Sequence, residues 1–332
     1  MLNIVWIIFI AYIIDLIVGD PYWFPHPVIY MGKYIAFVER LARKNKSIDN
    51  RTNNKEHKST KKIEFAVGIF ICLSLIAITS VVTYIIIKIF EFSFFAKSIV
   101  SAVIIAITFS TRCLGKEANK VYKALKSNDI KKARLCLSYI VGRQTESLDE
   151  QEIIRATVET VAENSVDGTI APMFYAFIGG PMMAMVYKAV NTMDSMLGYR
   201  NERYEFIGKV PAITDDIFNF IPARISIISI AISSIFLKLD WKSCFRISIR
   251  DRKKHKSPNC AYPEGAYAGA MNIELGGINI YFGEEVHKPT IGDNINRLDK
   301  ENITMSIKIL YISTFINFLL LSILTYVIYL LH

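Results

Sequence analysis

Long apolar segments constrain the fold of this chain more than any other feature of its sequence. Residues 303–331 form the clearest of them, and residues 66–90 also exceed the roughly 20 residues that a helix needs to cross a bilayer. Further apolar segments cover residues 2–18, 95–110, 169–190 and 220–239. Backbone groups in lipid must be paired within the chain, so such segments are helical. The sequence therefore predicts an all-α integral membrane protein with about 4–6 membrane helices.

We expect a single membrane-embedded domain over residues 1–332, ending in a C-terminal membrane helix at 303–331. Residues 2–18 lack a basic flank and a small-residue cleavage site, which favours a retained helix over a removed signal peptide. Residues 44–62 are polar, strongly basic and poor in aromatic residues, which predicts a flexible loop.

Two of the apolar segments leave the topology open. Residues 169–190 are broken by prolines and glycines, and such breaks at membrane depth need cover from protein or a water-filled cavity. If residues 220–239 cross the bilayer fully, residues 169–190 must cross too, and the polar stretch 191–219 then faces outward. We favour re-entrant segments and helical polar loops, because the polar motifs then form one site on the cytoplasmic side. That side is indicated by the basic stretches 40–62, 112–134 and 242–256.

The composition fits a membrane protein with large polar loops. Hydrophobic residues make up 52% of the chain and charged residues 21%, and the net charge is +9. The positive charge favours anionic partners such as phosphates, carboxylates or acidic lipid. We expect no nucleic-acid partner, because the basic residues form no recognisable binding motif. The five cysteines are scattered without a CxxC pair, which argues against disulfides and a zinc site.

An unusual acidic motif, VETVAENSVDGTIAP at residues 158–172, leads into the broken segment. Glu159, Glu163 and Asp167 are four residues apart and share one face of a helix. Arg155 can pair with Glu159 one turn earlier, which is the ordinary explanation for such acids. The sequence offers no such cation to Glu163 and Asp167. Simple exposure to solvent explains these two acids less well, because the helix leads directly into an apolar segment.

More acids follow beside the next apolar segments. Asn191 and Asp194 share a helix face one turn after Lys188, and the adjacent Asp215 and Asp216 stand at the mouth of an apolar span, where unpaired acids are costly. Magnesium bound with a nucleotide needs only one or two carboxylates, together with phosphate oxygens and water. We therefore predict a magnesium site drawn from Glu163, Asp167, Asp194, Asp215 and Asp216.

A basic and glycine-rich stretch covers residues 250–292. A basic run beside a span is most often a topology signal, but here it leads into the turn Ser257-Pro258-Asn259 and the pair Gly276-Gly277, whose backbone amides suit phosphate. The chain contains no Walker A loop and no GxGxxG motif. The predicted anion contacts are Arg250, Arg252, Lys253, His255 and Ser257, with Asn259 as a positioning group.

Near the N-terminus, Gly19-Asp20-Pro21 follows the first apolar segment. A helix stop and a turn explain it equally well. His26 lies between two prolines, which holds it rigidly and suits a ligand contact, although a lone histidine is weak support. The remaining candidates for binding substrate or phosphate are Asp20, His26, Asn164, Lys188, Asn191 and Arg224.

Taken together, these motifs resemble the CobD/CbiB family, the adenosylcobinamide-phosphate synthases of cobalamin biosynthesis. The resemblance covers about residues 10–295, in family order. It is carried by the stretches DLIVGDPYWFPHPVIYMG, VETVAENSVDGTIAPMFY, YKAVNTMDSMLGY, DDIFNFIPAR and RDRKKHKSPN followed by YPEGAYAGAMNIELGGINIYFG.

The resemblance implies an ATP-dependent amide ligase in the cell membrane that uses Mg²⁺. ATP would activate the free propionate of adenosylcobyric acid, a corrinoid, and 1-aminopropan-2-ol or its O-phosphate would then attack. Association with membrane lipid is implied, and association with other cobalamin-assembly membrane enzymes is left open. The roles of single residues come from chemistry rather than from the family. On that basis Glu163, Asp167, Asp194 and Asp216 are the predicted catalytic residues.

Other classes remain as alternatives. A magnesium-dependent membrane prenyltransferase also uses acids at a membrane face, but Gly198 stands where a further acid would follow Asp194. A transporter would show a broken helix like residues 169–190, yet the chain has few clear spans and no repeated halves. An inactive relative that senses or scaffolds would not need these acidic motifs.

Overall fold

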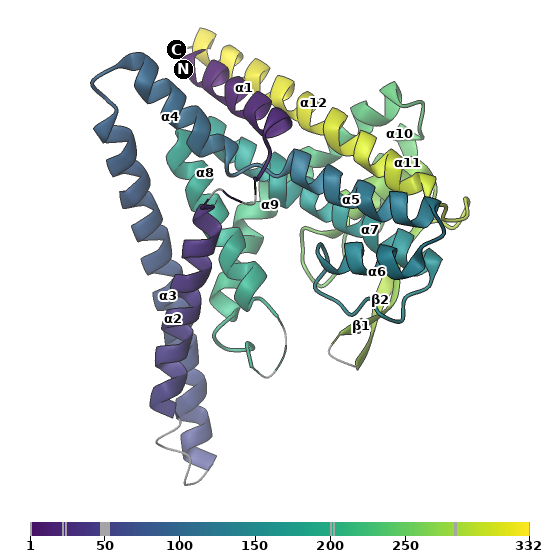
Figure 1. Cartoon of the computed structure of the whole chain (residues 1–332), viewed down its shortest axis with the longest axis horizontal. Coiled ribbons are helices and arrows are strands. Elements are labelled where there is room, and N and C mark those ends of the chain that lie inside the picture. Colours follow the sequence, from purple (N-terminus) through teal and green to yellow (C-terminus); the bar gives the residue numbers. More distant parts are fainter. Residues whose placement is uncertain are drawn as a thin grey trace.

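The structure, a computed structural model, describes residues 2–21, 23, 25–46, 54–199, 201, 203–281 and 284–331. These residues form helices throughout, apart from one two-stranded antiparallel hairpin (Figure 1). Five helical stretches are long and apolar enough to cross a membrane: Lys61–Ile89, Phe94–Lys126, Glu150–Leu197, Lys209–Phe236 and Glu301–Leu331. The prediction of an all-α integral membrane protein is therefore confirmed, and the chain is a multi-pass membrane protein.

The elements divide into two groups along the chain. The first group is α1 (Leu2–Ile17), α2 (Pro27–Lys46), α3 (Asn54–Ile89), α4 (Phe94–Ala106), α5 (Thr111–Lys126), α6 (Ile130–Ser138) and α7 (Glu150–Ser165). The second is the π-helical turn η1 (Val166–Ile170), α8 (Ala171–Leu197), α9 (Lys209–Phe236), α10 (Trp241–Arg250), α11 (Ala261–Met271), β1 (Glu274–Tyr281), β2 (Glu284–Gly292) and α12 (Glu301–Leu331).

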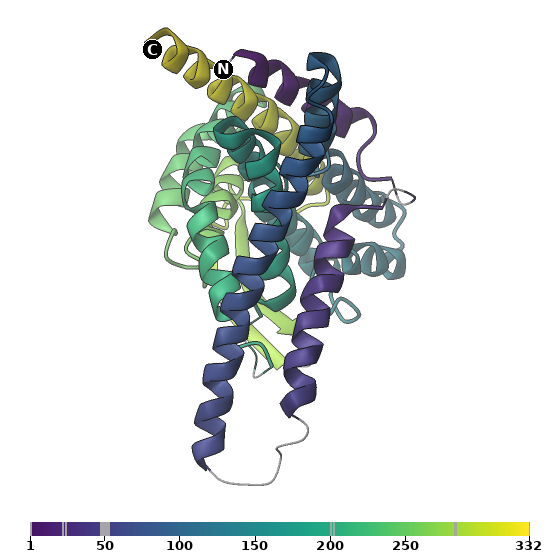
Figure 2. The same ribbon diagram turned by 90° about the vertical axis from the view of Figure 1, so that its left-hand side faces the viewer.

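The more apolar part of the molecule is built from α1, α3, α4, the first half of α8 and the end of α12. Both chain termini lie there (Figure 1), and α2 runs beside α3 to form a long projecting pair (Figure 2). Many large apolar side chains on these helices are exposed, for example Trp6, Phe70 and Leu331. Exposed apolar surface of this extent is what a lipid-facing surface requires.

The other part is a compact body of shorter helices. Its core is formed by α5, α6, α7, α10 and α11 with the adjoining halves of α9 and α12, around buried residues such as Leu137, Ile153 and Tyr267. Asp149 caps α7 in a capping box with Glu152, which fixes where that helix begins. A short turn at residues 127–129 separates α5 from α6.

The long helical run from α7 to α8 is broken twice. At η1 the chain makes a wide π-helical turn, a feature frequent at functional sites. At Gly179 and Gly180 the backbone leaves the helical region, and Gly180 has φ 63° before Pro181, which cannot continue a hydrogen-bonded helix. The predicted break within residues 169–190 is confirmed. The run of 48 residues is much longer than a bilayer requires, so only part of it can lie in lipid.

Two sequence expectations need correction. The flexible loop predicted for residues 44–62 is wrong at its ends, because α2 continues to Lys46 and α3 begins at Asn54, and residues 47–53 lie outside the described part of the chain. The stretch after Met271 was predicted only as a glycine-rich phosphate contact, whereas it forms the β1–β2 hairpin. The alternation of β-branched and polar residues there was a strand signal that the glycines obscured.

Candidate active site

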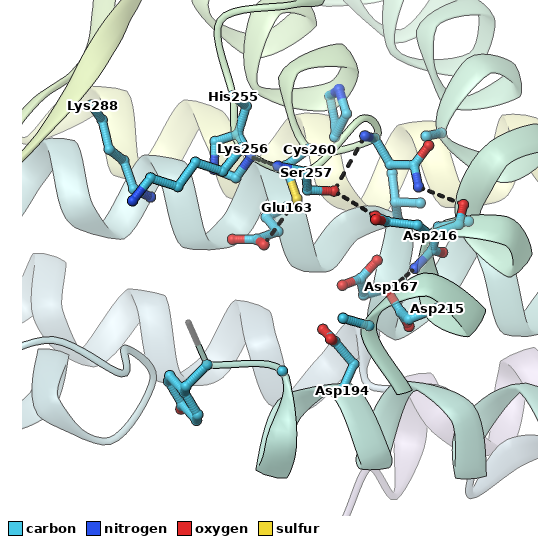
Figure 3. Close-up of a pocket in the computed structure, with 18 of the residues that line it drawn as sticks. Glu163, Asp167, Asp194, Asp215, Asp216, His255, Lys256, Ser257, Cys260 and Lys288 are labelled. Carbon is cyan, nitrogen blue, oxygen red and sulfur yellow. Dashed lines mark hydrogen bonds between the residues drawn. The ribbon is translucent and has the colours of Figure 1, made fainter. Parts of the chain in front are cut away.

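A large cavity, of about 980 Å³, is lined by residues from the α7–η1 junction through to the hairpin. Its walls come from the α7–η1 junction, the end of α8, the start of α9, the segment between α10 and α11, and β2. Figure 3 shows acidic side chains along one side and a group of basic side chains along the other. We call these sides the acidic wall (Glu163, Asp167, Asp194, Asp215 and Asp216) and the basic wall (Lys254, His255, Lys256 and Lys288).

The acidic wall brings together all five acids that the sequence nominated for a metal. They come from four different helical elements, and each stands near the beginning or end of its helix or on the π-helical turn. Glu163 lies in the last turn of α7, Asp167 on the π-helical turn and Asp194 in the last turn of α8. The spacing of these acids in the sequence predicted that they could bind a metal. The packing of α8 against α9 and η1 is what brings them to the same cavity.

Amide and hydroxyl groups orient parts of the acidic wall. Asn219 donates from Nδ2 to Asp215 Oδ2 at 2.9 Å, and the Tyr187 hydroxyl donates to Asn219 Oδ1 at 2.9 Å. Asn191 Nδ2 lies 3.5 Å from Asp167 Oδ2. The other oxygen of Asp215, Oδ1, is buried and has no hydrogen-bond partner among the residues that the structure describes. A buried acceptor in this condition is costly unless a cation or donor completes it.

Glu163 forms a hydrogen bond with a thiol. Cys260 Sγ donates to Glu163 Oε1 at 3.1 Å. Burial, followed by the nearby Glu163, raises the pKa of Cys260 well above its usual range, so this thiol stays protonated and remains a donor. Hydrogen bonds thus join the acidic wall to neutral amide and thiol groups.

The basic wall is carried by irregular chain and by the hairpin. Lys254 is partly engaged, since its Nζ lies 2.9 Å from both Asp251 Oδ1 and the Thr290 carbonyl. His255 accepts the Ser257 N–H through Nδ1 at 3.0 Å, and burial together with Lys288 lowers the pKa of His255. At neutral pH the cations of this wall are therefore the three lysines.

One polar turn joins the two walls. Ser257 Oγ donates to Asp216 Oδ1 at 3.0 Å, and Asn259 Nδ2 donates to the Asp216 carbonyl at 2.8 Å. Arg224 donates to Asn259 Oδ1 at 3.2 Å, with its guanidinium 3.5 Å from the Phe220 ring centroid and 4.4 Å from that of Tyr262. Ser257 and Asn259 line the cavity as predicted, whereas Arg224 stands behind Asn259 and positions it.

Three other predicted phosphate contacts lie elsewhere. Arg250 binds Asp251, Asp293 and the Gly292 carbonyl, a network that ties α10 to the end of β2. Arg252 donates to the Ile249 carbonyl and is exposed, as is Lys253. None of the three lines the cavity. The sequence predicted that the basic run belongs to the site. Only the structure shows which of its residues line the cavity and which hold neighbouring elements in place.

The arrangement around Glu159 is structural. The predicted pairing with Arg155 is confirmed at 3.8 Å, and Arg143 pairs more closely, at 2.8 Å. Glu159 Oε1 also accepts the Gly276 N–H at 2.8 Å, so it fastens β1 to α7. Gly276 has φ 88° at an irregularity in the strand pairing, where a side chain would be strained. That amide is thereby occupied and unavailable for phosphate.

One smaller cavity shares lining residues with the large one, and another shares lining residues with that smaller cavity. A cavity of about 430 Å³ shares Glu163, Asp167 and Asp194 with it and adds Asn164 and Asn191. The other, of about 530 Å³, contains the remaining predicted binding residues, namely Asp20, His26, Lys188 and again Asn191. The structure thus groups the N-terminal motif with α8 rather than with the basic wall.

Comparison with known proteins places this chain in a family. The model of the family described as CobD/Cbib protein matches residues 8–310. The chain belongs to the CobD/CbiB family. It is 49% identical to the cobalamin biosynthesis protein CobD of Clostridium tetani over 92% of this chain and 93% of that one, and 40% identical to CbiB of Salmonella typhi over 92% of each. No solved structure matches the chain.

Membership of this family of cobalamin biosynthesis proteins confirms the resemblance found in the sequence. It does not identify a metal. In the described part of the chain, no three Asp, Glu, His or Cys side chains are grouped closely enough to hold a metal ion on their own. The residues nevertheless fit a Mg²⁺ ion that takes its other ligands from a nucleotide and water, because Asp215 Oδ1 is unpaired and carboxylate oxygens are the preferred ligands.

Sequence reasoning missed several residues that line the CobD/CbiB cavities. Lys254 and Lys256 belong to the same basic run as His255 and line the large cavity. The sequence does not show which residues of that run face a cavity. Lys288 gave no local signal, and Glu264 lies in a motif that was read only as a family resemblance. Burial and the nearby Glu159 raise the pKa of Glu264, which lines the cavity of about 430 Å³, well above its usual range.

Proposed function

We propose that this protein is the amide ligase of cobalamin biosynthesis that joins adenosylcobyric acid to 1-aminopropan-2-ol or its O-phosphate. ATP would convert the free propionate into an acyl phosphate. Family membership supports the biosynthetic role. The single structural observation that supports the chemistry is the large cavity, which is lined by five acids and three lysines.

This division of charge suits a magnesium nucleotide. A triphosphate carries several negative charges, and phosphoryl transfer is catalysed mainly by positioning and by neutralising them. Lys254, Lys256 and Lys288 would contact phosphate oxygens. Asp167 and Asp215 would hold Mg²⁺ together with nucleotide oxygens and water, and the ion when bound would supply electrostatic stabilisation of the transferring phosphoryl group.

The proposed reaction forms and breaks bonds in two steps. A propionate oxygen attacks the terminal phosphorus of ATP, the bond from that phosphorus to the ADP oxygen breaks, and an acyl phosphate results. The amine nitrogen then attacks the acyl carbon, the carbon–oxygen bond to phosphate breaks, and inorganic phosphate leaves. The nitrogen gives up a proton, for which the carboxylates of the acidic wall are nearby acceptors. Glu163 and Asp216 are our candidates for this role.

An assay on the full chain purified in detergent tests the proposal. Adenosylcobyric acid, magnesium ATP and either 1-aminopropan-2-ol or its O-phosphate are supplied, and the corrinoid is followed by mass while ADP is followed by a coupled assay. Amide product formed together with ADP is expected. Folded protein that forms no product with either amine would overturn the ligase proposal.

A transporter is the second candidate, because the broken helix α8 passes beside the cavity. Proteoliposomes loaded with corrinoid distinguish the two. Corrinoid flux without ATP and without amide formation would favour transport, and amide formation without flux would favour the ligase.

A further inference from the structure

The 530 Å³ cavity is separate from the proposed catalytic cavity and has its own set of charged side chains. It is bounded by the connection between α1 and α2, by the first turns of α5 and by the second half of α8. Asn191 and Ser195 line both this cavity and the one that contains Glu163, Asp167 and Asp194. The smaller cavity therefore borders the acidic wall across one turn of α8.

Cations predominate in the smaller cavity. Arg112, Lys116 and Lys188 line it from α5 and α8, against two carboxylates, Asp20 and Glu117. Glu117 is already paired, because Lys120 Nζ lies 2.7 and 2.8 Å from its two oxygens. The cavity thus offers three cations and one carboxylate, Asp20, to a ligand.

His26 is a neutral group in this cavity. Its Nδ1 accepts the Val28 N–H at 3.3 Å, and its Nε2 lies 2.9 Å from the Ile107 carbonyl, an acceptor. The proton of the ring is therefore on Nε2, which also lies 3.7 Å from Asp20 Oδ1. Burial lowers the pKa of His26, which agrees with a neutral ring. Since both ring nitrogens are engaged, His26 positions Asp20 and is not itself a base.

Lys188 connects the two cavities electrostatically. It lies close enough to Asp20 on one side and to Asp167 on the other to interact with both charges. Among the residues that the structure describes, its Nζ donates to Ser110 Oγ over a long distance of 3.5 Å. A ligand phosphate beside Lys188 would therefore gain a cation that protein oxygens do not already satisfy closely.

The turn before α2 is shaped to bring the charges together. Gly19 has φ 64°, and a Cβ atom at this position would lie 3.0 Å from Arg112 Cδ. Arg112 in turn donates to the Leu16 carbonyl at 2.5 Å. The Gly19-Asp20-Pro21 motif is therefore more than a helix stop, since glycine allows Arg112 and Asp20 to approach the same space.

We propose that this smaller cavity binds the amine substrate as a small zwitterion, with its phosphate monoester held by Arg112, Lys116 and Lys188 and its ammonium group held by Asp20. The inference rests on the proposed function for the identity of the ligand. Val18, Ile29 and Met196 line the rest of the cavity and suit a short carbon chain. Across the turn that carries Asn191, the amine would lie next to the cavity where the acyl phosphate forms.

Equilibrium binding to the detergent-purified full chain tests this inference without turnover. The probes are 1-aminopropan-2-ol O-phosphate, 1-aminopropan-2-ol, propyl phosphate and inorganic phosphate, each titrated in the absence of ATP. We expect the amino-alcohol phosphate to bind at least about 10-fold more tightly than any of the other three, because each of those lacks one of the groups that the cavity recognises. Equal binding of the unphosphorylated amine would overturn the proposal.

Variants locate the site. Lys116→Gln changes an exposed side chain, so the protein should fold, and it should weaken binding of the amino-alcohol phosphate and of propyl phosphate by about 10-fold. Asp20→Asn should reduce binding of the amino-alcohol phosphate to the level of propyl phosphate. Lys288→Ala, in the other cavity, should leave binding of both unchanged.

The outcomes separate this inference from the proposed function. If Lys116→Gln weakens magnesium ATP and not the amino-alcohol phosphate, the smaller cavity belongs to the nucleotide site and the inference fails. If the amino-alcohol phosphate binds as expected but no amide forms with adenosylcobyric acid and ATP, the ligase proposal fails while the binding site stands.

Discussion

The two walls of the large cavity carry their charges on different kinds of structure. The acids stand on helix ends and on a π-helical turn, where neighbouring helices leave a side chain little freedom. The lysines stand on the irregular segment after α10 and on a two-stranded hairpin. Magnesium demands near-ideal octahedral geometry, whereas a lysine acts on phosphate as a flexible point charge. The difference indicates that position matters most on the acidic wall and charge matters most on the basic wall.

The largest effect is expected from Asp167→Asn, which keeps the shape of the side chain and removes its charge. Turnover in the amide assay should fall by about 1000-fold, the scale of losing one preorganised electrostatic group in an active site. Glu150→Gln is the matched control, since Glu150 is an exposed acid in the first turn of α7, and its activity should be unchanged. Near-full activity of Asp167→Asn would show that the acidic wall is only a solvated surface.

A smaller effect, and one confined to nucleotide affinity, is expected from Lys288→Ala. The KM for ATP should rise by about 10- to 100-fold, the equivalent of one hydrogen bond to a charged group, while kcat changes less. Lys288→Arg should restore most of the affinity, because the basic wall is proposed to require charge more than position. Lys131→Ala, an exposed lysine on α6, serves as the control. A fall in kcat with KM unchanged would contradict the division between the walls.

The basic wall should also depend on a carboxylate that does not line it. Asp251 is buried and accepts from Arg250, from the Gly292 N–H at 2.9 Å and from Lys254, so it holds the segment in place. Asp251→Asn should lower the free energy of unfolding by about 2 kcal/mol, as expected for a lost charge-assisted contact. Thermal denaturation in detergent measures this, and a KM for ATP that rises in parallel would tie the network to the wall.

The pH dependence of that loss gives a second test. Burial alone would raise the pKa of Asp251, but the hydrogen bonds from Arg250, Gly292 and Lys254 outweigh it and lower the pKa to about 2. A carboxylate with a lowered pKa in the folded state stabilises the protein above its ordinary value of 3.8, and that contribution is lost as the pH falls through about 2. The difference between wild type and Asp251→Asn should therefore be constant above about pH 4 and shrink toward pH 2. A difference that is independent of pH over this range would contradict this origin.

The smallest effect is expected where the walls meet. Ser257→Ala removes the hydrogen bond to Asp216 Oδ1, and turnover should fall by about 5-fold, on the scale of one hydrogen bond worth about 1 kcal/mol. Ser257→Thr keeps the hydroxyl and should retain more of the activity than Ser257→Ala. Equal losses for the two variants would mean that the hydroxyl does not position Asp216.

The sequence by itself determined the class of the protein, its family and most of the acids. The features that determined them are local, so they can be recognised from neighbouring residues in the sequence. They are the apolar segments of bilayer length, the Gly179-Gly180-Pro181 break and the motif around Asp167. For the same reason the pairing of Arg155 with Glu159 could be predicted, since the two lie one helical turn apart.

Only the tertiary structure decided which charges share a cavity. Arg250 and Lys254 stand in the same basic run, yet Arg250 braces the hairpin while Lys254 lines the cavity. Lys288 reaches the same cavity from a strand, and Asp20 joins Lys188 in a different one although their motifs are far apart in the sequence. The physical reason is that charge and helix periodicity are properties of neighbouring residues, whereas a binding cavity is formed by the packing of elements distant along the chain.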